Sequence, residues 1–332
     1  MTPEKFVKLL CEKKLLLPPI SGYTDFPYRT ILAHFQPPFI ITEMANARAI
    51  VQGNKKTSDI LKIVKGPHYN GVQLVGSDPG FMTKAAQIVA NLGFDYIDIN
   101  MGCTARKVAC KGEGVSLMKD EDGACTLVSM ISAAVDVPVT CKLRIGASPR
   151  SLNVLSLSQK LTKAGACAIT IHGRSGEKKF GTPIDLGLIR DVADALSVPV
   201  ITNGGIFSGV DALHALQKTG AAAVMPGRGL IGNPWIIQEI MKAFSKDPFI
   251  PPSLHEKKDV CLKHLRLLCD FYGERTGVLR MRKILPEYFS SCEFLNELKR
   301  DVQRVDYTRD IPPLLERIRE LDERVVYEMR IA

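Results

Sequence analysis

Cys103 has the sequence setting that best suits proton-transfer chemistry. It follows the apolar run Tyr96–Asn100 in the segment INMGCTARKVACKGEG, and the loop after it, Thr104–Glu113, carries three cationic side chains. A partly exposed cysteine among cations is the usual setting of a reactive thiol. Cys110 lies in the same loop, but no histidine or third cysteine completes a metal-binding set, so we expect no metal site. We interpret the other cysteines as small apolar residues that pack in the core.

Lys142 and His172 each end an apolar run, in PVTCKLR and ITIHGR. A buried lysine is rare without a partner. A flavin ring would supply one, because a lysine can neutralise negative charge near N1 and O2 of the reduced ring; an internal ion pair is the alternative. His172 is either a ligand contact or a satisfied core residue. Gln73 and Asn203 could form hydrogen bonds to the amide-like edge of such a ring, or only to the protein backbone.

Two glycine-containing segments indicate a phosphate site. Gly204-Gly205 follows the seventh apolar run, and Gly227-Arg228 follows the eighth. In eight-stranded α/β barrels these loops often bind phosphate through backbone N–H groups. Glycine lets the backbone approach a ligand closely, and Arg228 could pair with phosphate oxygens. One such glycine-containing segment alone would indicate only a tight turn.

The elements that must position these residues form a repeating pattern. Eight apolar runs are each followed by an amphipathic segment, and their starts lie 24 to 41 residues apart, about the length of a strand, a helix and two loops. Continuous apolar runs are typical of a buried parallel sheet. We therefore predict a TIM (β/α)8 barrel rather than a doubly wound sheet, because no glycine fingerprint follows the first run. The predicted strands are Leu15–Ile20, Phe39–Thr42, Gly71–Val75, Tyr96–Asn100, Val137–Lys142, Ala168–His172, Val198–Asn203 and Ala222–Pro226.

A helical segment follows the barrel. Pro248, Pro251 and Pro252 indicate a linker, and from Glu256 onward apolar residues recur at helical spacing. We predict a catalytic domain at residues 1–245 and a smaller all-helical domain at residues 246–332. The predicted helices within the barrel include Gly80–Leu92, Gly123–Val135, Leu152–Lys163 and Gly209–Lys218.

Composition limits the class of protein. The 332 residues carry 44 Lys and Arg against 35 Asp and Glu, a net charge of +9, which suggests a polyanionic partner. No apolar stretch reaches the ~20 residues of a membrane span, and the first residues lack the features of a signal peptide. Nine cysteines without a CxxC pair fit a reducing compartment, so we expect a cytoplasmic protein. Nothing in the sequence indicates a protein partner.

The motifs, taken in order, resemble those of the tRNA-dihydrouridine synthases. The matching segments are LPPISGYTDFPYR, ITEM, VQLVGSDP, DYIDINMGCTARKV, VPVTCKLRIG, ITIHGR, VPVITNGGI and MPGRGLIGNPWI, between about Leu15 and Ile236. The resemblance implies an FMN-containing TIM barrel followed by a helical tRNA-binding domain. The implied reaction reduces the C5–C6 double bond of selected uridines in tRNA. NADPH first reduces the flavin, hydride then passes from flavin N5 to C6, and an acid protonates C5.

The resemblance also implies roles for single residues. Cys103 falls on the family's catalytic acid, and Asn100 resembles the asparagine that contacts the target uracil. Arg144 and Arg174, at strand ends, are further candidates to contact substrate. The basic tail residues Arg280, Arg282 and Lys283 fit the RNA-binding domain more loosely. The implied cofactor contacts are Pro19, Ile20, Ser21, Gln73, Lys142, His172, Asn203, Gly204, Gly205, Gly227 and Arg228.

The sequence departs from the family pattern at three places. Thr104 stands where a proline usually follows the catalytic cysteine, Pro18-Pro19-Ile20 replaces Ala-Pro-Met, and the usual NGD is NGG, ending at Gly205. A proline would stiffen the loop by fixing φ, so Thr104 predicts a less rigid loop. Two other interpretations remain. One is a flavin barrel that acts on a free base, of the dihydroorotate or dihydropyrimidine type. The other is a tRNA-binding barrel without catalysis.

Charge counts along the chain predict where tRNA would bind. Residues 239–332 hold eighteen positive and seventeen negative side chains, so most of the excess lies in the barrel. Basic loop residues near the predicted active face include Arg106, Lys107, Lys111, Lys178 and Lys179. We therefore expect a tRNA footprint that spans both domains and centres on Cys103.

Overall fold

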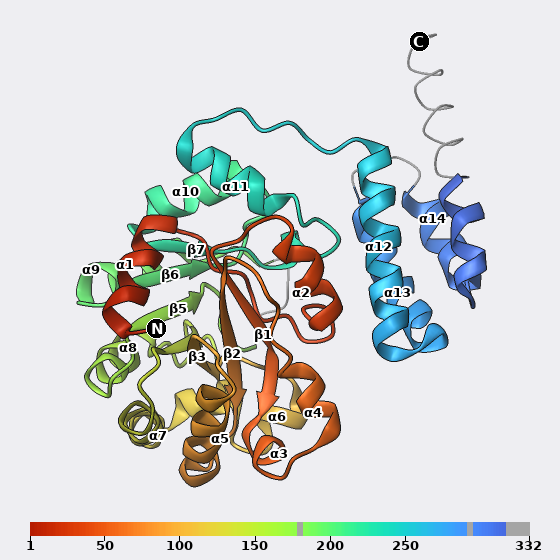
Figure 1. Cartoon of the computed structure of the whole chain (residues 1–332). Helices are drawn as coiled ribbons and strands as arrows, with labels where there is room; N and C mark the ends of the chain where they lie inside the picture. The colour runs from red at the N-terminus through yellow and green to blue at the C-terminus, as the bar shows by residue number, and fades with distance from the viewer. Residues whose placement is uncertain (178–181, 291–294, 317–332) are drawn as a thin grey trace.

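The computed structural model of the chain describes residues 1–177, 182–290 and 295–316 (Figure 1). Its centre is a sheet of seven parallel strands whose spatial order follows the chain, β1-β2-β3-β4-β5-β6-β7. Most strand residues are buried, as the continuous apolar runs predict. The strands are β1 Phe39–Asn46, β2 Tyr69–Val75, β3 Tyr96–Met101, β4 Val139–Arg144, β5 Ala168–His172, β6 Val200–Asn203 and β7 Ala223–Met225.

The first predicted strand closes the barrel without becoming a regular strand. Val224 N donates to Lys14 O at 2.9 Å, and Leu16 N donates to Val224 O at 3.1 Å. On the other side, Leu17 N donates to Phe39 O at 3.2 Å. The segment therefore joins β7 to β1, which confirms the TIM barrel. The prediction of a strand at Leu15–Ile20 was wrong in extent, because only a bridge at Leu15 forms and the following Pro18 and Pro19 have no N–H to donate.

Helices cover the outside of the barrel (Figure 1). The four predicted within it are confirmed to within two residues at each end as α5, α7, α8 and α10. Local capping explains two of their starts: the Asp78 side chain accepts from Phe81 N at 2.8 Å, and Ser208 Oγ accepts from Asp211 N at 3.1 Å. The helices up to residue 245 are α1 Pro3–Lys13, α2 Phe26–Ala33, α3 Ala47–Val51, α4 Lys55–Ile60, α5 Pro79–Asn91, α6 Arg106–Ala109, α7 Glu121–Ala134, α8 Val154–Lys163, α9 Leu186–Ala195, α10 Gly209–Thr219 and α11 Ile236–Ser245.

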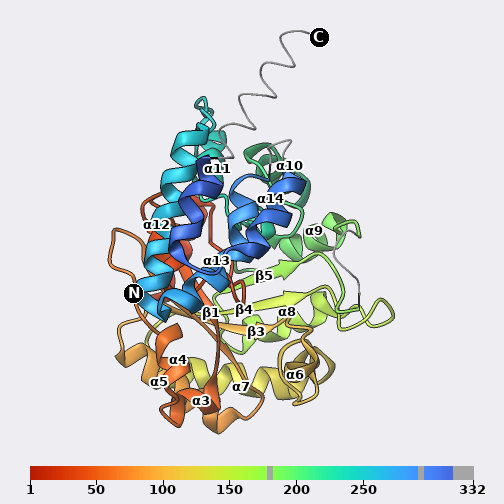
Figure 2. The same cartoon turned by 90° about the vertical axis from the view of Figure 1, so that its right-hand side faces the viewer.

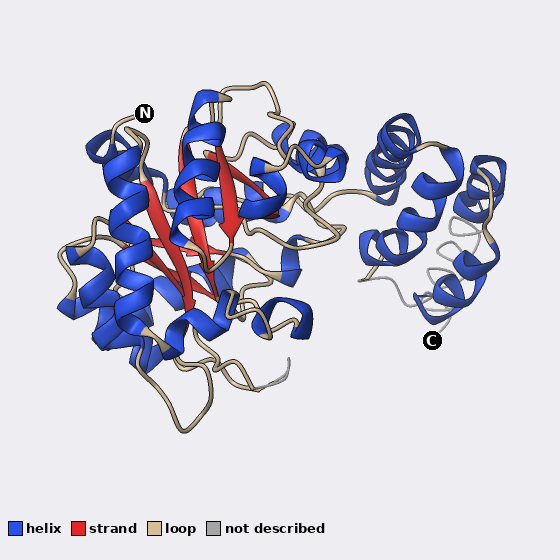
Figure 3. Ribbon diagram, turned by 90° about the horizontal axis from the view of Figure 1, so that it is seen from below, coloured by secondary structure: helices blue, strands red, loops and turns tan. Residues whose placement is uncertain are grey.

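In the described part of the chain after residue 253, three further helices form: α12 Leu254–Tyr272, α13 Glu274–Tyr288 and α14 Leu295–Asp301. Figures 1 and 3 show them grouped on one side of the barrel, and Figure 2 views the molecule from that side. A capping box between Ser253 and Glu256 starts α12. Residues 246–253 form neither helix nor strand, as the prolines predict, and the division into two domains at this point stays a prediction.

The tail helices share a hydrophobic core with the barrel. Tyr28 and Leu32 of α2 belong to the same buried cluster as Leu265 of α12 and Met281 of α13. The ring of Tyr28 stacks on His264 with 4.9 Å between centroids. Within the described part of the chain, no helix combines the length and apolarity needed to cross a bilayer.

We predict that Gly71→Ala destabilises the barrel by about 1–3 kcal/mol. A Cβ on Gly71 in β2 would overlap the ring of Tyr96. That ring is fully buried, and its hydroxyl donates to Ile40 O at 3.2 Å, so it has no room to withdraw. Urea denaturation measures the free energy of unfolding.

The control for this prediction is Gly187→Ala in α9. There the new Cβ would lie 3.5 Å from Asp185 Oδ1, an ordinary contact, and alanine favours the helix by up to about 1 kcal/mol. Equal stability of the two variants would contradict the packing argument.

Candidate active site

A cavity of about 200 Å³ lies over the carboxyl ends of the strands, where barrel enzymes place their chemistry. Nine of the eleven predicted cofactor contacts line it; Ser21 and Gln73 do not. It also takes in Arg144 and Arg174, which we predicted to contact substrate. The lining residues are Pro18, Pro19, Ile20, Lys142, Arg144, His172, Arg174, Asn203, Gly204, Gly205, Ile206, Phe207, Gly227 and Arg228.

The cavity is strongly cationic. Burial, followed by the charges of Lys142, Arg144, Arg174 and Arg228, lowers the pKa of His172 to about 2. His172 is therefore neutral at physiological pH, and its Nε2 lies 3.5 Å from Arg174 Nη1. Burial also lowers the pKa of both Arg144 and Arg174. Cations that crowd together in a partly dry pocket favour an anionic ligand.

Lys142 of β4 is held by an amide. Its Nζ donates to Asn203 Oδ1 at 2.8 Å, and Asn203 Nδ2 donates to Met225 O at 2.8 Å. Burial lowers the pKa of Lys142 to about 8, against the opposing effect of the Asp98 carboxylate. The lysine is thus aimed into the cavity by a neutral partner, with its charge only partly balanced.

The predicted phosphate loops have the backbone that only glycine adopts easily. Gly204 has φ +113° and Gly205 has φ +70°. A Cβ on Gly204 would lie 2.6 Å from Ile184 Cδ1 and 3.0 Å from His172 Cδ2. At Gly227, by contrast, a Cβ would have no described heavy atom within 4 Å, so the backbone there borders open space. Gly204 and Gly205 therefore make a tight turn, whereas Gly227 leaves open space beside its backbone.

Asn100 of β3 holds the start of the Cys103 loop. Its Oδ1 accepts from Cys103 N at 2.9 Å and from Gly102 N at 3.2 Å. Arg144 Nε donates to Gly102 O at 2.8 Å, which fixes the same turn from the neighbouring strand. The backbone at Cys103 is thus held from two neighbouring strands. Its own side chain is half-buried.

Gln73 lies beneath this turn and does not line the cavity. It is fully buried, and its Oε1 accepts from Asn100 Nδ2 at 2.8 Å. Its Nε2 donates to Asp98 Oδ2 at 2.7 Å. Sequence reasoning missed Asp98, although a carboxylate inside the apolar run YIDIN was a usable signal, because a buried acid requires partners.

The other end of the Cys103 loop turns at Gly114. Its φ is +61°, and Val115 N donates to Cys103 O at 3.0 Å. A Cβ on Gly114 would lie 2.7 Å from Cys103 O and 3.1 Å from Cys103 Cβ. The place of Cys103 therefore depends on a glycine at 114.

The three predicted tail contacts all have protein partners. Lys283 Nζ donates to Gly22 O at 2.7 Å, and Arg280 Nη1 lies 3.4 Å from Asp25 Oδ2. These two bonds tie α13 to the loop after Ser21, which is exposed. Arg282 instead bonds within the tail: its Nε donates to Val305 O at 2.7 Å, and it pairs with Asp306.

Carboxylates lie at the same junction between the barrel and α13. Glu43 accepts from Gly22 N, and burial raises the pKa of both Glu43 and Asp25. The charge of Arg280 partly offsets this effect. Arg280 also lies over the ring of Tyr272, 3.9 Å from its centroid.

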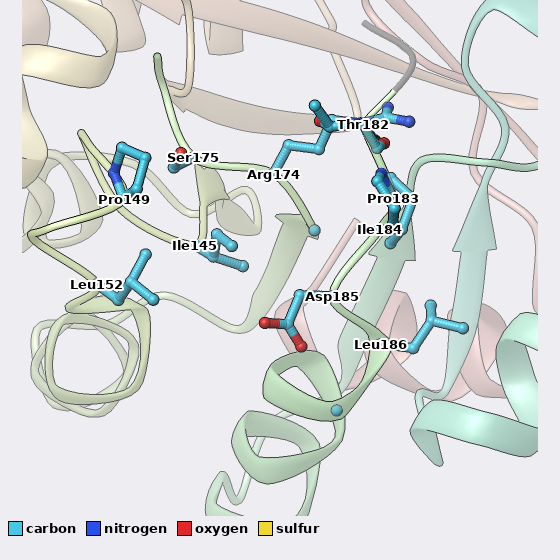
Figure 4. A pocket seen from close by; sticks show the side chains of 12 residues that line it. Ile145, Pro149, Leu152, Arg174, Ser175, Thr182, Pro183, Ile184, Asp185 and Leu186 are labelled. Atoms are coloured by element: carbon cyan, nitrogen blue, oxygen red, sulfur yellow. Dashed lines mark hydrogen bonds between the residues drawn. The ribbon is translucent and has the colours of Figure 1, made fainter. Parts of the chain in front are cut away.

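A larger cavity, of about 570 Å³, adjoins the first one at Arg174. Figure 4 shows Pro149 and Leu152 on one side of it and Pro183 and Ile184 on the other, with Asp185 toward α9. Among the described residues that line this cavity, Arg174 is the one cation. Lys178 and Lys179, which we predicted to contribute to the basic face, lie outside the described residues.

Comparisons with known proteins agree with this geometry. The sequence model described as dihydrouridine synthase (Dus) matches residues 16–321. The chain belongs to the dihydrouridine synthase family. The match begins in the barrel-closing segment and runs through the described tail helices, so it covers the cavity, the Cys103 loop and α12–α14.

Named relatives are similar over most of their length. A probable tRNA-dihydrouridine synthase from Rhizobium leguminosarum bv. phaseoli is 37% identical over 276 residues, covering 83% of this chain and 84% of the relative. The tRNA-dihydrouridine synthase B of Pasteurella multocida is 35% identical over 283 residues, covering 85% of each. That of Escherichia coli K12 is 34% identical over 294 residues, covering 88% of this chain and 92% of the relative.

Among solved structures, histamine dehydrogenase from Rhizobium sp. 4-9 is similar in fold. The TM-score is 0.51 at 14% identity, and the match covers 76% of this chain and 49% of that chain. At this identity the likeness concerns the barrel architecture alone.

We predict that Gly114→Ala displaces Cys103, because the added methyl meets the Cys103 carbonyl and the backbone φ is unfavourable for alanine. The rate of Cys103 alkylation by iodoacetamide should change several-fold, measured on the isolated peptide by mass spectrometry. Gly112→Ala is the matched control, since its φ is also positive (+74°) but its Cβ would meet only Ser77, at 3.8 Å. If both variants alkylate alike, backbone strain and not the contact with Cys103 is responsible.

Proposed function

We propose that the protein is a tRNA-dihydrouridine synthase that reduces the C5–C6 double bond of uridines in tRNA. The observation that carries this is a half-buried cysteine, held on its loop by Asn100 and Arg144, beside a cationic cavity at the carboxyl end of the barrel. The names of the relatives support the same activity.

We propose FMN as the cofactor, because the cavity suits an anionic, phosphorylated ligand with a polar ring. Its glycines, at 204, 205 and 227, offer backbone for close approach, and Arg174 and Arg228 offer charge for a phosphate. Lys142 would lie against the ring, where its positive charge would balance the negative charge of the reduced form. When bound and reduced by NADPH, FMN supplies the hydride for C6 of the uracil. Pro19 and Ile20 line the same cavity and add apolar surface to it.

Cys103 is the proposed acid for C5 of the uracil. The S–H group of a cysteine can donate a proton to a base that is aligned with it. Asn100 and Arg144 fix the backbone on either side of Gly102 and so set the position of the thiol. Arg144 also lines the cavity, where it can stabilise negative charge on a uracil oxygen. The target base has to leave the RNA stack to reach this depth.

The net charge of +9 supports a polyanionic substrate. We propose that tRNA contacts the basic loop after Cys103 and the helical tail together. Arg280 and Lys283 contribute to this surface from the junction, where their bonds to Asp25 and Gly22 also hold α13. We place the protein in the cytoplasm, in keeping with eight described cysteines that are all free.

Replacing Cys103 by alanine tests the function. We expect Cys103→Ala to bind FMN and tRNA but to form dihydrouridine at least ~100-fold more slowly, because the general acid is lost. Dihydrouridine is counted by mass spectrometry of digested tRNA, and flavin by its visible absorption. Cys110→Ala, in the same loop, should keep its activity.

Three outcomes would oppose this assignment. Full turnover by Cys103→Ala removes the acid role. Reduction of free uracil in place of tRNA by the unaltered protein points to a free-base oxidoreductase. A colourless protein that binds tRNA without taking up FMN indicates a binding role.

The charge of Lys142 predicts a pH dependence of FMN affinity. Its pKa is about 8 without ligand, and a bound anion would raise it. Affinity should therefore fall as pH rises through about 8, because binding then requires uptake of a proton. Fluorescence titration with FMN measures the dissociation constant. Lys142→Met should bind more weakly and lose the slope; an unchanged slope would assign the titration to another group.

A further inference from the structure

Asp98 of β3 is a buried carboxylate directly beneath the active site. Its side chain is 1% exposed. Oδ1 accepts from Thr140 Oγ1 at 2.7 Å, and Oδ2 accepts from Gln73 Nε2 at 2.7 Å. Asp98 is buried and is not among the residues that line the cavity. Its partners, however, lead to Cys103.

The hydrogen bonds from Asp98 to Cys103 form one chain with a fixed direction. An ionised carboxylate only accepts, so the Gln73 amide must turn its NH₂ toward Asp98. Its oxygen then faces Asn100 and accepts from Nδ2 at 2.8 Å. This leaves Asn100 Oδ1 to accept from the backbone N–H of Gly102 and Cys103.

The two ends of this chain of hydrogen bonds have opposite roles: Asp98 accepts at one end, and the backbone N–H groups of Gly102 and Cys103 donate at the other. Backbone N–H groups can only donate, and the carboxylate can only accept, so the two amides between them have a single orientation that satisfies every bond. An amide by itself can turn either way at little cost. The carboxylate removes that freedom for Gln73, and the backbone N–H groups and Gln73 together remove it for Asn100, so the two ends of the chain enforce the same orientation.

We propose that Asp98 is a positioning residue for Cys103: through Gln73 and Asn100 it sets the amide orientation that holds the acid loop in place. This inference deepens the proposed function, on which it rests. We call Asp98, Gln73 and Asn100 the polar relay. Thr140 anchors its buried end, and the N–H groups of Gly102 and Cys103 form its other end.

Asp98→Asn tests the relay. The introduced asparagine could keep its oxygen toward Gln73 only if Thr140 turned its hydroxyl to Ile97 O, which is 3.5 Å away and too far for a good hydrogen bond. The favoured asparagine therefore accepts from Thr140 and presents NH₂ to Gln73. Both amides then have to turn, and Asn100 would present NH₂ to N–H groups that cannot accept. We expect dihydrouridine formation to slow roughly 100-fold, as for small misplacements of a reacting group. Flavin reduction by NADPH and tRNA affinity should stay near those of the unaltered protein, so the loss falls on kcat. Rates are expressed per bound flavin.

The decisive variant is the exchange Asp98→Asn with Gln73→Glu. The introduced asparagine can then donate to one oxygen of the introduced carboxylate, whose other oxygen accepts from Asn100 Nδ2. Positions 98 and 73 together keep one negative charge, and Asn100 again turns its Oδ1 toward the backbone N–H groups. We therefore expect most of the lost rate to return. Gln73→Glu alone places two carboxylates together and should be impaired like Asp98→Asn. Two harmful changes that repair each other cannot result from general loss of packing.

Alkylation of Cys103 by iodoacetamide gives a readout that needs no turnover. The rate should rise in each single variant, as the loop loosens, and return toward the original value in the exchange variant. Thr140→Val removes one donor to Asp98 and should cause a smaller loss of activity. Thr170→Val is its matched control: Thr170 is equally buried on the neighbouring strand, but its hydroxyl bonds nothing among the described residues.

The inference is overturned if Asp98→Asn keeps the original turnover and Cys103 reactivity, or if the exchange variant is no better than the single ones. It is also overturned if Asp98→Asn slows flavin reduction as much as tRNA reduction, since Asp98 would then act as a counter-charge for Lys142. An unaltered protein that forms no dihydrouridine refutes the proposed function instead. In that case the alkylation rates still report on the relay.

Discussion

Closure of the barrel is the constraint on which the rest of the structure depends. Seven parallel strands would leave β7 and β1 with unpaired edges, and the short segment at Lys14–Leu17 fills that gap with three backbone hydrogen bonds. Closure brings Pro19 and Ile20, near the start of the chain, to the same cavity as Gly227 and Arg228, more than 200 residues later. The two prolines that end the pairing also direct the chain over the strand ends. A site built from both ends of the barrel therefore exists only when the ring is complete.

Within that ring, positive charge is concentrated where water is scarce. Lys142, Arg144 and Arg174 all have lowered pKa values, with burial as the first cause in each case. Mutual repulsion adds to the effect, and one buried carboxylate opposes it for Lys142. Holding these cations together is thus electrostatically costly, and an anion that entered the cavity would relieve the cost. The folded protein is less stable for holding these cations together, but the same cluster would favour binding of an anion in the cavity.

Much of this arrangement followed from sequence because its signals are local. Apolar runs with polar ends located every strand of the sheet, and glycines at 204 and 205 indicated a backbone that the structure shows at positive φ. One failure had a local cause: Leu15–Ile20 has the composition of a strand, but its own prolines cut the pairing short.

The side chains that sequence reasoning placed less well have partners distant in sequence. Arg282 looked like its neighbours Arg280 and Lys283, yet its partners at Val305 and Asp306 lie within the tail. Asp98 was overlooked because its role depends on two amides, from Gln73 and Asn100, that line up with it only in the folded barrel. Thr104 predicted a looser loop; the bonds from Asn100 and the turn at Gly114 restrain the loop at both ends without a proline.

The core shared by Tyr28, Leu32, Leu265 and Met281 has a consequence for how the chain folds. Residues 246–253 look like a boundary along the chain, but the apolar surfaces on its two sides cover one another. Neither part can expose its share of that core to water without losing the free energy of burial. The barrel and the described tail helices should therefore form and melt as a single cooperative unit, so that a shortened chain ending at α11 would expose apolar surface and be aggregation-prone.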